Sequence, residues 1–142
     1  MRIYLSRRDW AAIKESGEKA YPQECCGFLL GHVRDEVREV VKVLPATNDR
    51  GDEDRHNRYL IGPETFREGE RAAERDGVEI IGFYHSHPDA PARPSKYDTE
   101  HAWPWYAYVI VSVPGGKSVD LRSWVLQEDR AAFAEQDVVI ED

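Results

Sequence analysis

His85 and His87, separated by a single residue, are the side chains of this sequence best suited to chemistry. An apolar run over residues 78–85, typical of a strand, leads into them. Residues two apart on a strand point to the same face, so the spacing predicts that both imidazoles share a face with Ile81 and Phe83. Their Cα atoms would lie about 6–7 Å apart, which lets both rings converge on one ion.

Asp98 is a third candidate ligand, and it follows a loop with three prolines between residues 88 and 94. Two imidazoles and a carboxylate form a set suited to Zn²⁺, with a fourth position open for water, as in catalytic zinc sites. The residues alone also allow a simpler interpretation, because a lone His-x-His pair is weak evidence and Ser95 with Asp98 fits a helix capping box. Both interpretations can hold, since a cap at Ser95 would orient the Asp98 carboxylate.

Glu24 is the candidate base for such a centre, because it stands at the start of an apolar segment. Taken alone, it is more simply a solvated carboxylate in a loop. We predict structural roles for the other conspicuous residues. These are Ser86 on the opposite strand face, His32, His56 and His101 at the surface, Cys25 and Cys26 as buried small side chains, and Trp103, Trp105 and Trp124 in the core or at its rim.

The elements that must position these residues alternate between helix and strand. Helices are predicted over residues 6–20, 63–76 and 95–102, from cap residues at their starts and from Pro22 and Gly77 at the ends of the first two. Strands are predicted over residues 26–33, 36–44, 58–61, 78–85, 105–113, 119–127 and 134–140, and a mobile surface loop over residues 45–57. This order predicts an α+β domain in which helices flank a mixed β-sheet.

The candidate residues together resemble the signature of the JAMM (MPN-plus) zinc metallopeptidases. That signature is an upstream glutamate, then His-Ser/Thr-His-Pro, then Ser and Asp, and Glu24, His85, His87, Ser95 and Asp98 fill it without a gap. Seven residues separate the second histidine from the serine, and two separate the serine from the aspartate. The flanking segments 22–31 and 77–84 also look like the family's strands, so the resemblance covers residues 3–127, nearly the whole chain.

The resemblance implies a fold, a mechanism and a substrate class. The fold would be a single JAMM/MPN domain over residues 1–142, a sheet flanked by helices in a layout similar to cytidine deaminases. His85, His87 and Asp98 would bind Zn²⁺, Glu24 would act as general base and then acid, and Ser95 would donate a hydrogen bond to the oxyanion. The lack of further domains looks most like the free-standing bacterial branch, similar to the CysO-cysteine peptidases, which act on ubiquitin-like sulfur-carrier proteins.

Composition excludes several other classes of function. The 142 residues carry a formal net charge of −8, which disfavours a nucleic-acid partner and a role similar to the RadC-type relatives. No apolar stretch approaches the ~20 residues that span a bilayer, so no membrane role is expected. The adjacent cysteines disfavour a structural disulfide, and we expect a cytoplasmic protein. A nucleoside deaminase would need zinc-ligand motifs that are missing here. The remaining alternative is a non-catalytic MPN-type scaffold.

Overall fold

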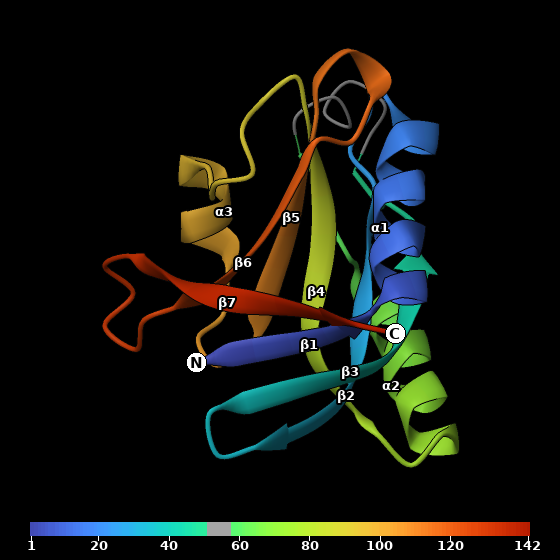
Figure 1. Cartoon of the computed structure of the whole chain (residues 1–142), viewed down its shortest axis with the longest axis vertical. Helices are drawn as coiled ribbons and strands as arrows, with labels where there is room; N and C mark the ends of the chain where they lie inside the picture. The colour runs from blue at the N-terminus through green and yellow to red at the C-terminus, as the bar shows by residue number, and fades with distance from the viewer. Residues whose placement is uncertain (51–57) are drawn as a thin grey trace.

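The computed structural model describes residues 1–50 and 58–142. Within this part of the chain, seven strands form one mixed sheet in the order β1–β3–β2–β4–β5–β6–β7, and the sheet closes on itself (Figure 1). The strands are β1 (Arg2–Ser6), β2 (Cys26–Arg34), β3 (Val37–Ala46), β4 (Glu79–Pro88), β5 (Ala107–Val113), β6 (Asp120–Leu126) and β7 (Phe133–Glu141). The helices are α1 (Arg7–Ala20), α2 (Pro63–Arg75) and α3 (Lys96–His101), with a 3₁₀ turn at Pro114–Gly116.

The closure of the sheet differs from the open, flanked sheet that the sequence predicts. Strand β1 was not predicted, and it joins the two ends of the sheet, because it pairs in parallel with both β3 and β7. Ile3 and Leu5 of β1 are fully buried. Burial of these two side chains, at about 25 cal/mol per Å² of apolar surface, stabilises a short strand in which Ile3 and Tyr4 already favour the β conformation.

The predicted strand over residues 58–61 is wrong, because this segment is irregular. Its backbone groups bond to the loop after β3 instead of to another strand. The Asp49 N–H donates to the Leu60 carbonyl (2.8 Å), and the Leu60 N–H donates to Asn48 Oδ1 (3.1 Å). Residues 51–57, which include the predicted surface residue His56 and most of the predicted mobile loop, lie outside the described residues.

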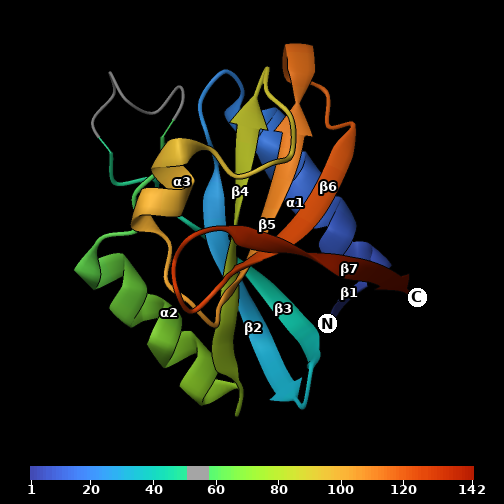
Figure 2. The ribbon, with the colours of Figure 1, turned by 90° about the vertical axis from the view of Figure 1, so that its left-hand side faces the viewer.

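Two apolar clusters cover the two faces of the sheet. Helix α1 packs on one face, where Ile13 joins a cluster with side chains of β1, β4 and β5. Helix α2 packs on the other face, where Ala72 and Ala73 contact Phe28 and Phe83. In Figure 2 strands β2 and β4 stand between the two helices. The side chain of a residue on β4 therefore faces either α1 or α2.

A bulge in β4 decides which residues share the face of the histidines. Leu29 pairs with Gly82 and Leu30 with Ile80, so Ile81 is an extra residue in the ladder. The bulge turns Ile81 into the α1 cluster, whereas Phe83 lies in the α2 cluster. The prediction that Ile81 and Phe83 share a face is therefore wrong, because strand alternation fails at a bulge.

The extra residue of the bulge also has a hydrogen-bond partner for its backbone. The carbonyl of Ile81 accepts a hydrogen bond from the buried Arg38 guanidinium (3.1 Å).

The helix boundaries follow the local signals closely. Ser6 caps α1, accepting a hydrogen bond from the Asp9 N–H (3.0 Å), and Pro63 occupies the first turn of α2. Gly77 follows α2 with a φ of 69°, a conformation that glycine adopts without a steric cost. In the described part of the chain, no helix is both long and apolar enough to cross a membrane.

Candidate metal centre

Three potential ligand atoms converge at the end of β4. The Nε2 atoms of His85 and His87 are 3.2 Å apart, and Asp98 Oδ2 lies 3.3 Å from the first and 3.0 Å from the second. The side chains of His85 and Asp98 are 1% and 8% exposed, so bulk water is largely excluded from them. The structure thus brings together the three residues that the sequence predicts as ligands, and they form a group that could hold a metal ion.

The spacing of the three atoms fits a tetrahedral metal ion. Zinc bonds to nitrogen and carboxylate oxygen are about 2.0–2.2 Å long, so two ligand atoms of a tetrahedral site lie roughly 3.3–3.5 Å apart. The observed separations of 3.0–3.3 Å are slightly shorter. Hydrogen bonds alone do not account for this arrangement, because a neutral imidazole has only one N–H and each ring must satisfy two nitrogens.

The hydrogen bond of His87 Nδ1 determines that the other ring nitrogen, Nε2, faces the candidate metal centre. Nδ1 lies 2.8 Å from the Pro91 carbonyl, which can only accept, so Nδ1 carries the proton and Nε2 of the neutral ring carries a lone pair. Burial lowers the pKa of His85, which favours its neutral, ligand-competent form. Among the described residues, His85 Nδ1 has no hydrogen-bond partner.

A capping box at the start of α3 orients the Asp98 carboxylate. The Asp98 N–H donates to Ser95 Oγ (3.0 Å), and the Ser95 N–H donates to Asp98 Oδ2 (2.9 Å). The cap and the ligand set therefore coexist, as the sequence allowed. Burial opposes ionisation of Asp98, but the neighbouring His85 and His87 rings outweigh it and hold the pKa of Asp98 well below its usual range. Ser95 itself is exposed, so its hydroxyl hydrogen is accessible to a bound molecule.

Glu24 is a buried carboxyl group beside these atoms, not the solvated residue that it resembles in isolation. It is 5% exposed, and its Oε1 has no partner among the described residues. Burial, reinforced by the nearby negative charge of Asp98, raises the pKa of Glu24 to about 9. An unpaired buried carboxyl group is costly, so this atom fits a site that supplies a water molecule or a cation.

The backbone on both sides of Glu24 is fixed by residues that the sequence did not single out for this role. Ser86, between the two histidines, accepts a hydrogen bond from the Cys25 N–H through its Oγ (2.9 Å) and donates its own N–H to the Cys25 carbonyl (3.2 Å). The Asn48 side chain donates to the Glu24 carbonyl (3.2 Å). The strand that carries the histidines thus also holds the glutamate in place.

The loop from residue 89 to 94 is held against the sheet by side chains of β5 and β6. Ser112 Oγ donates to the Ala90 carbonyl (2.6 Å), and Trp124 Nε1 donates to the Ala92 carbonyl (3.0 Å). These two bonds flank Pro91, whose carbonyl accepts the bond from His87. Asp89 adds a third connection, because its carboxylate accepts a hydrogen bond from the Tyr21 hydroxyl (2.7 Å), three residues before Glu24.

The remaining candidate residues lie outside the ligand set. His101 is exposed on α3 and stacks on Tyr97 with ring centroids 4.0 Å apart, in agreement with a surface role, and His32 is exposed on β2. Both cysteines are free thiols, and burial raises their pKa to about 11 for Cys25 and about 12 for Cys26, so neither is ionised near neutral pH. Tyr59, which the sequence did not suggest, stacks on His85 with centroids 4.5 Å apart.

Comparison with known sequences places the part of the chain that contains the candidate site residues in one family. Residues 6–127 match the family described as prokaryotic homologs of the JAB domain. A protein of Haloferax volcanii named desampylase is 35% identical over 121 residues, which cover 84% of this chain and 80% of the relative. A Thermus thermophilus protein, named a probable TtuB-protein conjugate cleaving protease, is 33% identical over 107 residues, which cover 75% of this chain and 64% of the relative.

Solved structures share the fold. A solution structure of a Desulfitobacterium hafniense protein superposes with a TM-score of 0.86 at 26% identity, covering 99% of this chain and 93% of that chain. A JAB1/MPN domain protein from Archaeoglobus fulgidus gives a TM-score of 0.54 at 19% identity, covering 98% of this chain and 99% of that one. The predicted JAB/MPN fold is confirmed, although the sheet closes where a flanked sheet was expected.

Trp124→Phe tests the role of β6 in holding the loop from residue 89 to 94. The variant keeps an aromatic side chain but loses the indole N–H that donates to the Ala92 carbonyl, so the free energy of unfolding should fall by at least about 0.5–1.5 kcal/mol. Amide exchange in residues 89–94 should also become faster. Trp10→Phe on α1 is the matched control and should leave exchange in this loop unchanged. Equal exchange in the two variants would show that Trp124 does not hold the loop.

Proposed function

The chain belongs to the family of prokaryotic homologs of the JAB domain, within the JAMM/MPN proteins, and from this premise we propose that it is a zinc-dependent metallopeptidase. It hydrolyses the amide bond after the C-terminal glycine of a ubiquitin-like carrier protein. The observation that carries the proposal is the convergence of two imidazole nitrogens and a carboxylate oxygen within 3.3 Å, beside the buried carboxyl group of Glu24. A scaffold protein has no need of either feature.

In the proposed hydrolysis, a bound ion and four kinds of side chain each have a separate role. Zn²⁺ held by His85, His87 and Asp98 would lower the pKa of a water molecule to about 7 and polarise the scissile carbonyl. Glu24 accepts the proton of the attacking water and delivers it to the leaving amine, which its burial without a partner favours. Ser95 donates a hydrogen bond to the oxyanion, because its hydroxyl is exposed and its lone pair already serves the cap.

The named activities of the relatives support the substrate class. The Thermus thermophilus relative is named for cleavage of protein conjugates, and the Haloferax volcanii relative is named desampylase. For this chain we propose a ubiquitin-like sulfur-carrier protein whose tail ends in glycine. We also propose that residues 1–142 form a single JAMM/MPN domain, since β1 near the N-terminus pairs with residues 137–141 of β7 near the C-terminus. The free thiols of Cys25 and Cys26 support a reducing, cytoplasmic setting.

Glu24→Gln tests the proton-transfer role. Glutamine preserves the shape of the buried side chain but cannot accept a proton, so hydrolysis of a carrier conjugate should be lost while the zinc content stays at that of the wild type. The exposed Glu79→Gln is the control and should keep full activity. Turnover by the Glu24→Gln protein would remove Glu24 from the mechanism.

His87→Ala tests the ligand set independently of activity. A metal that binds only the folded state stabilises it by about 2.7 kcal/mol at a concentration 100 times its Kd. Zinc should therefore raise the Tm of the wild-type protein and of the exposed control His32→Ala, but not that of His87→Ala. Metal analysis that finds His87→Ala fully occupied by zinc would contradict the assignment.

Two substitutions of Ser95 separate its hydroxyl from its role as a helix cap. Glycine is nearly as good an N-cap as serine, whereas alanine costs about 0.5–2 kcal/mol. If the hydroxyl stabilises the oxyanion, Ser95→Gly should lower kcat by roughly 10²–10³ with its zinc content unchanged, and Ser95→Ala should do the same. A wild-type rate for Ser95→Gly would leave Ser95 as a helix cap alone.

A further inference from the structure

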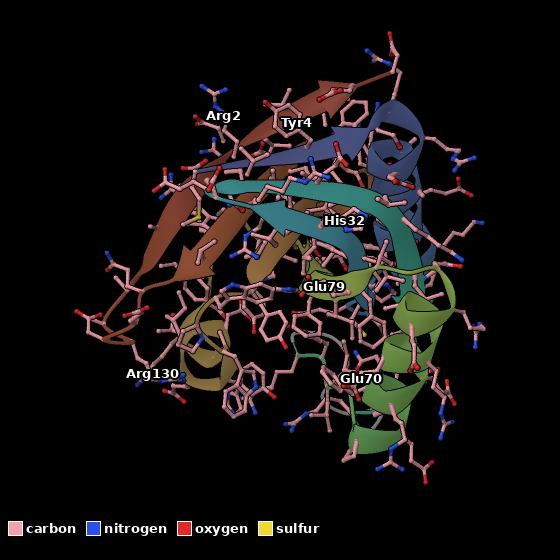
Figure 3. The ribbon with its side chains drawn as sticks, turned by 90° about the horizontal axis from the view of Figure 1, so that it is seen from below. Arg2, Tyr4, His32, Glu70, Glu79 and Arg130 are labelled. Carbon is pink, nitrogen blue, oxygen red and sulfur yellow. The ribbon has the colours of Figure 1, made fainter. Side chains whose placement is uncertain are left out.

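A cavity of about 780 Å³ lies beside the candidate metal centre, between α2 and α3. We name it the aromatic cavity, because its lining includes Phe66, Phe83, Trp103, Tyr106, Tyr108 and Phe133. Figure 3 shows α2 and α3 on either side of this region, with Glu70 labelled on α2 and Arg130 beside α3. The Arg130 guanidinium donates to the Glu100 carbonyl (3.4 Å) and so connects α3 with the turn before β7.

The wall of the cavity is already assembled by contacts among its own rings. The Phe83 ring lies 5.1 Å from that of Tyr106 and 5.6 Å from that of Tyr108, and the Tyr108 ring lies 5.8 Å from that of Phe133. The Tyr108 hydroxyl accepts a hydrogen bond from the Trp103 N–H (2.9 Å), which fixes the backbone at the cavity mouth. A preformed apolar concavity of this size is typical of a ligand site.

The mouth of the cavity exposes apolar side chains to solvent. Trp103 is 66% exposed and Leu60 is 43% exposed, and both line the cavity. Tryptophan at such a position is characteristic of binding surfaces. Arg67 and Glu70 of α2 contribute one exposed charge of each sign to the lining, and Asp98 and His101 contribute polar groups from α3. Most of the remaining lining is aromatic or aliphatic, so the cavity favours an apolar occupant.

The position of the aromatic cavity relative to the candidate metal centre indicates which part of a substrate would enter the cavity. The lining of the cavity includes His85 and Asp98, but neither His87 nor Glu24 is part of it. Under the proposed function, Glu24 must protonate the leaving amine, so the leaving group lies on the side of Glu24. The aromatic cavity therefore lies on the acyl side of the scissile bond.

We propose that the aromatic cavity is a subsite for a bulky apolar side chain, of leucine or phenylalanine size, in the carrier tail just before its terminal glycines. This inference rests on the proposed function and names a specificity that the function alone does not require. The volume exceeds that of one side chain, so the cavity also takes backbone of the adjacent residues. The occupant reaches the metal centre because the cavity is continuous with it.

A series of acyl-X-Gly-Gly-aminocoumarin peptides tests the preference with the zinc-loaded protein. With X as leucine or phenylalanine, kcat/KM should exceed that of the alanine peptide by at least about tenfold, and aspartate and lysine should fall below alanine. Equal rates for every X would overturn the subsite and leave the peptidase intact. A second series, acyl-Ala-Gly-Gly-Y peptides, varies only the residue Y after the scissile bond. Discrimination that follows Y and not X would place the cavity on the amine side and would also overturn the proposal.

Substitution at the cavity mouth gives the matched test. Trp103→Ala should reduce the ratio of kcat/KM for the leucine peptide to that for the alanine peptide by about tenfold, and the control Trp10→Ala should leave this ratio and both rates unchanged. Because Trp103 is largely exposed, its removal should not prevent folding. An unchanged preference for leucine in Trp103→Ala would contradict the proposal.

A binding measurement separates failure of the subsite from failure of the proposed function. Zinc-loaded Glu24→Gln should bind acetyl-Leu-Gly-Gly at least tenfold more tightly than acetyl-Ala-Gly-Gly, detected as a change in tryptophan fluorescence that Trp103→Phe abolishes. This preference in binding, together with no cleavage of any peptide by the wild type, would retain the subsite and reject the peptidase. Equal affinity for the two peptides would reject the subsite.

Discussion

The arrangement of this protein depends on holding two imidazoles and a carboxylate close enough for one ion. Strand β4 presents His85 and His87 on one face, but it ends at Pro88 and supplies no third ligand. Asp98 arrives from a separate helix, and its position depends on where that helix begins. The Ser95–Asp98 capping box fixes this start within 3.0 Å contacts, so one carboxylate serves both the helix and the centre.

The sequence predicts the features that depend on residues close together in the chain, and it misses those that depend on residues far apart. The cap at Ser95, the bounds of α2 and the common face of His85 and His87 are local, and they are read correctly because capping and strand periodicity act over a few residues. Strand β1 and the extra residue at Ile81 depend on partners far along the chain. No pattern within five residues at the N-terminus reveals that β1 closes the sheet.

The candidate site shows the same division. Motif spacing identifies Glu24, but its burial requires the Cys25–Ser86 pairing, which joins residues 61 positions apart. The acceptor of His87 is the backbone carbonyl of Pro91, and any residue there would supply the same group, so side-chain identity carries no signal for it. Tyr59 and Asn48 belong to segments without regular structure, where neither periodicity nor capping indicates which side chains face the centre.

The two carboxyl groups of the site explain why base and ligand set are interdependent. Glu24 and Asp98 are both shielded from water, and burial together with the Asp98 charge raises the pKa of Glu24 to about 9. In this arrangement, ionisation of Asp98 makes ionisation of Glu24 less favourable. A cation held by His85, His87 and Asp98 would offset this repulsion, because its positive charge would favour the ionised form of both carboxyl groups. Loss of a ligand would therefore impair the base as well, although Glu24 binds no metal in the proposed mechanism.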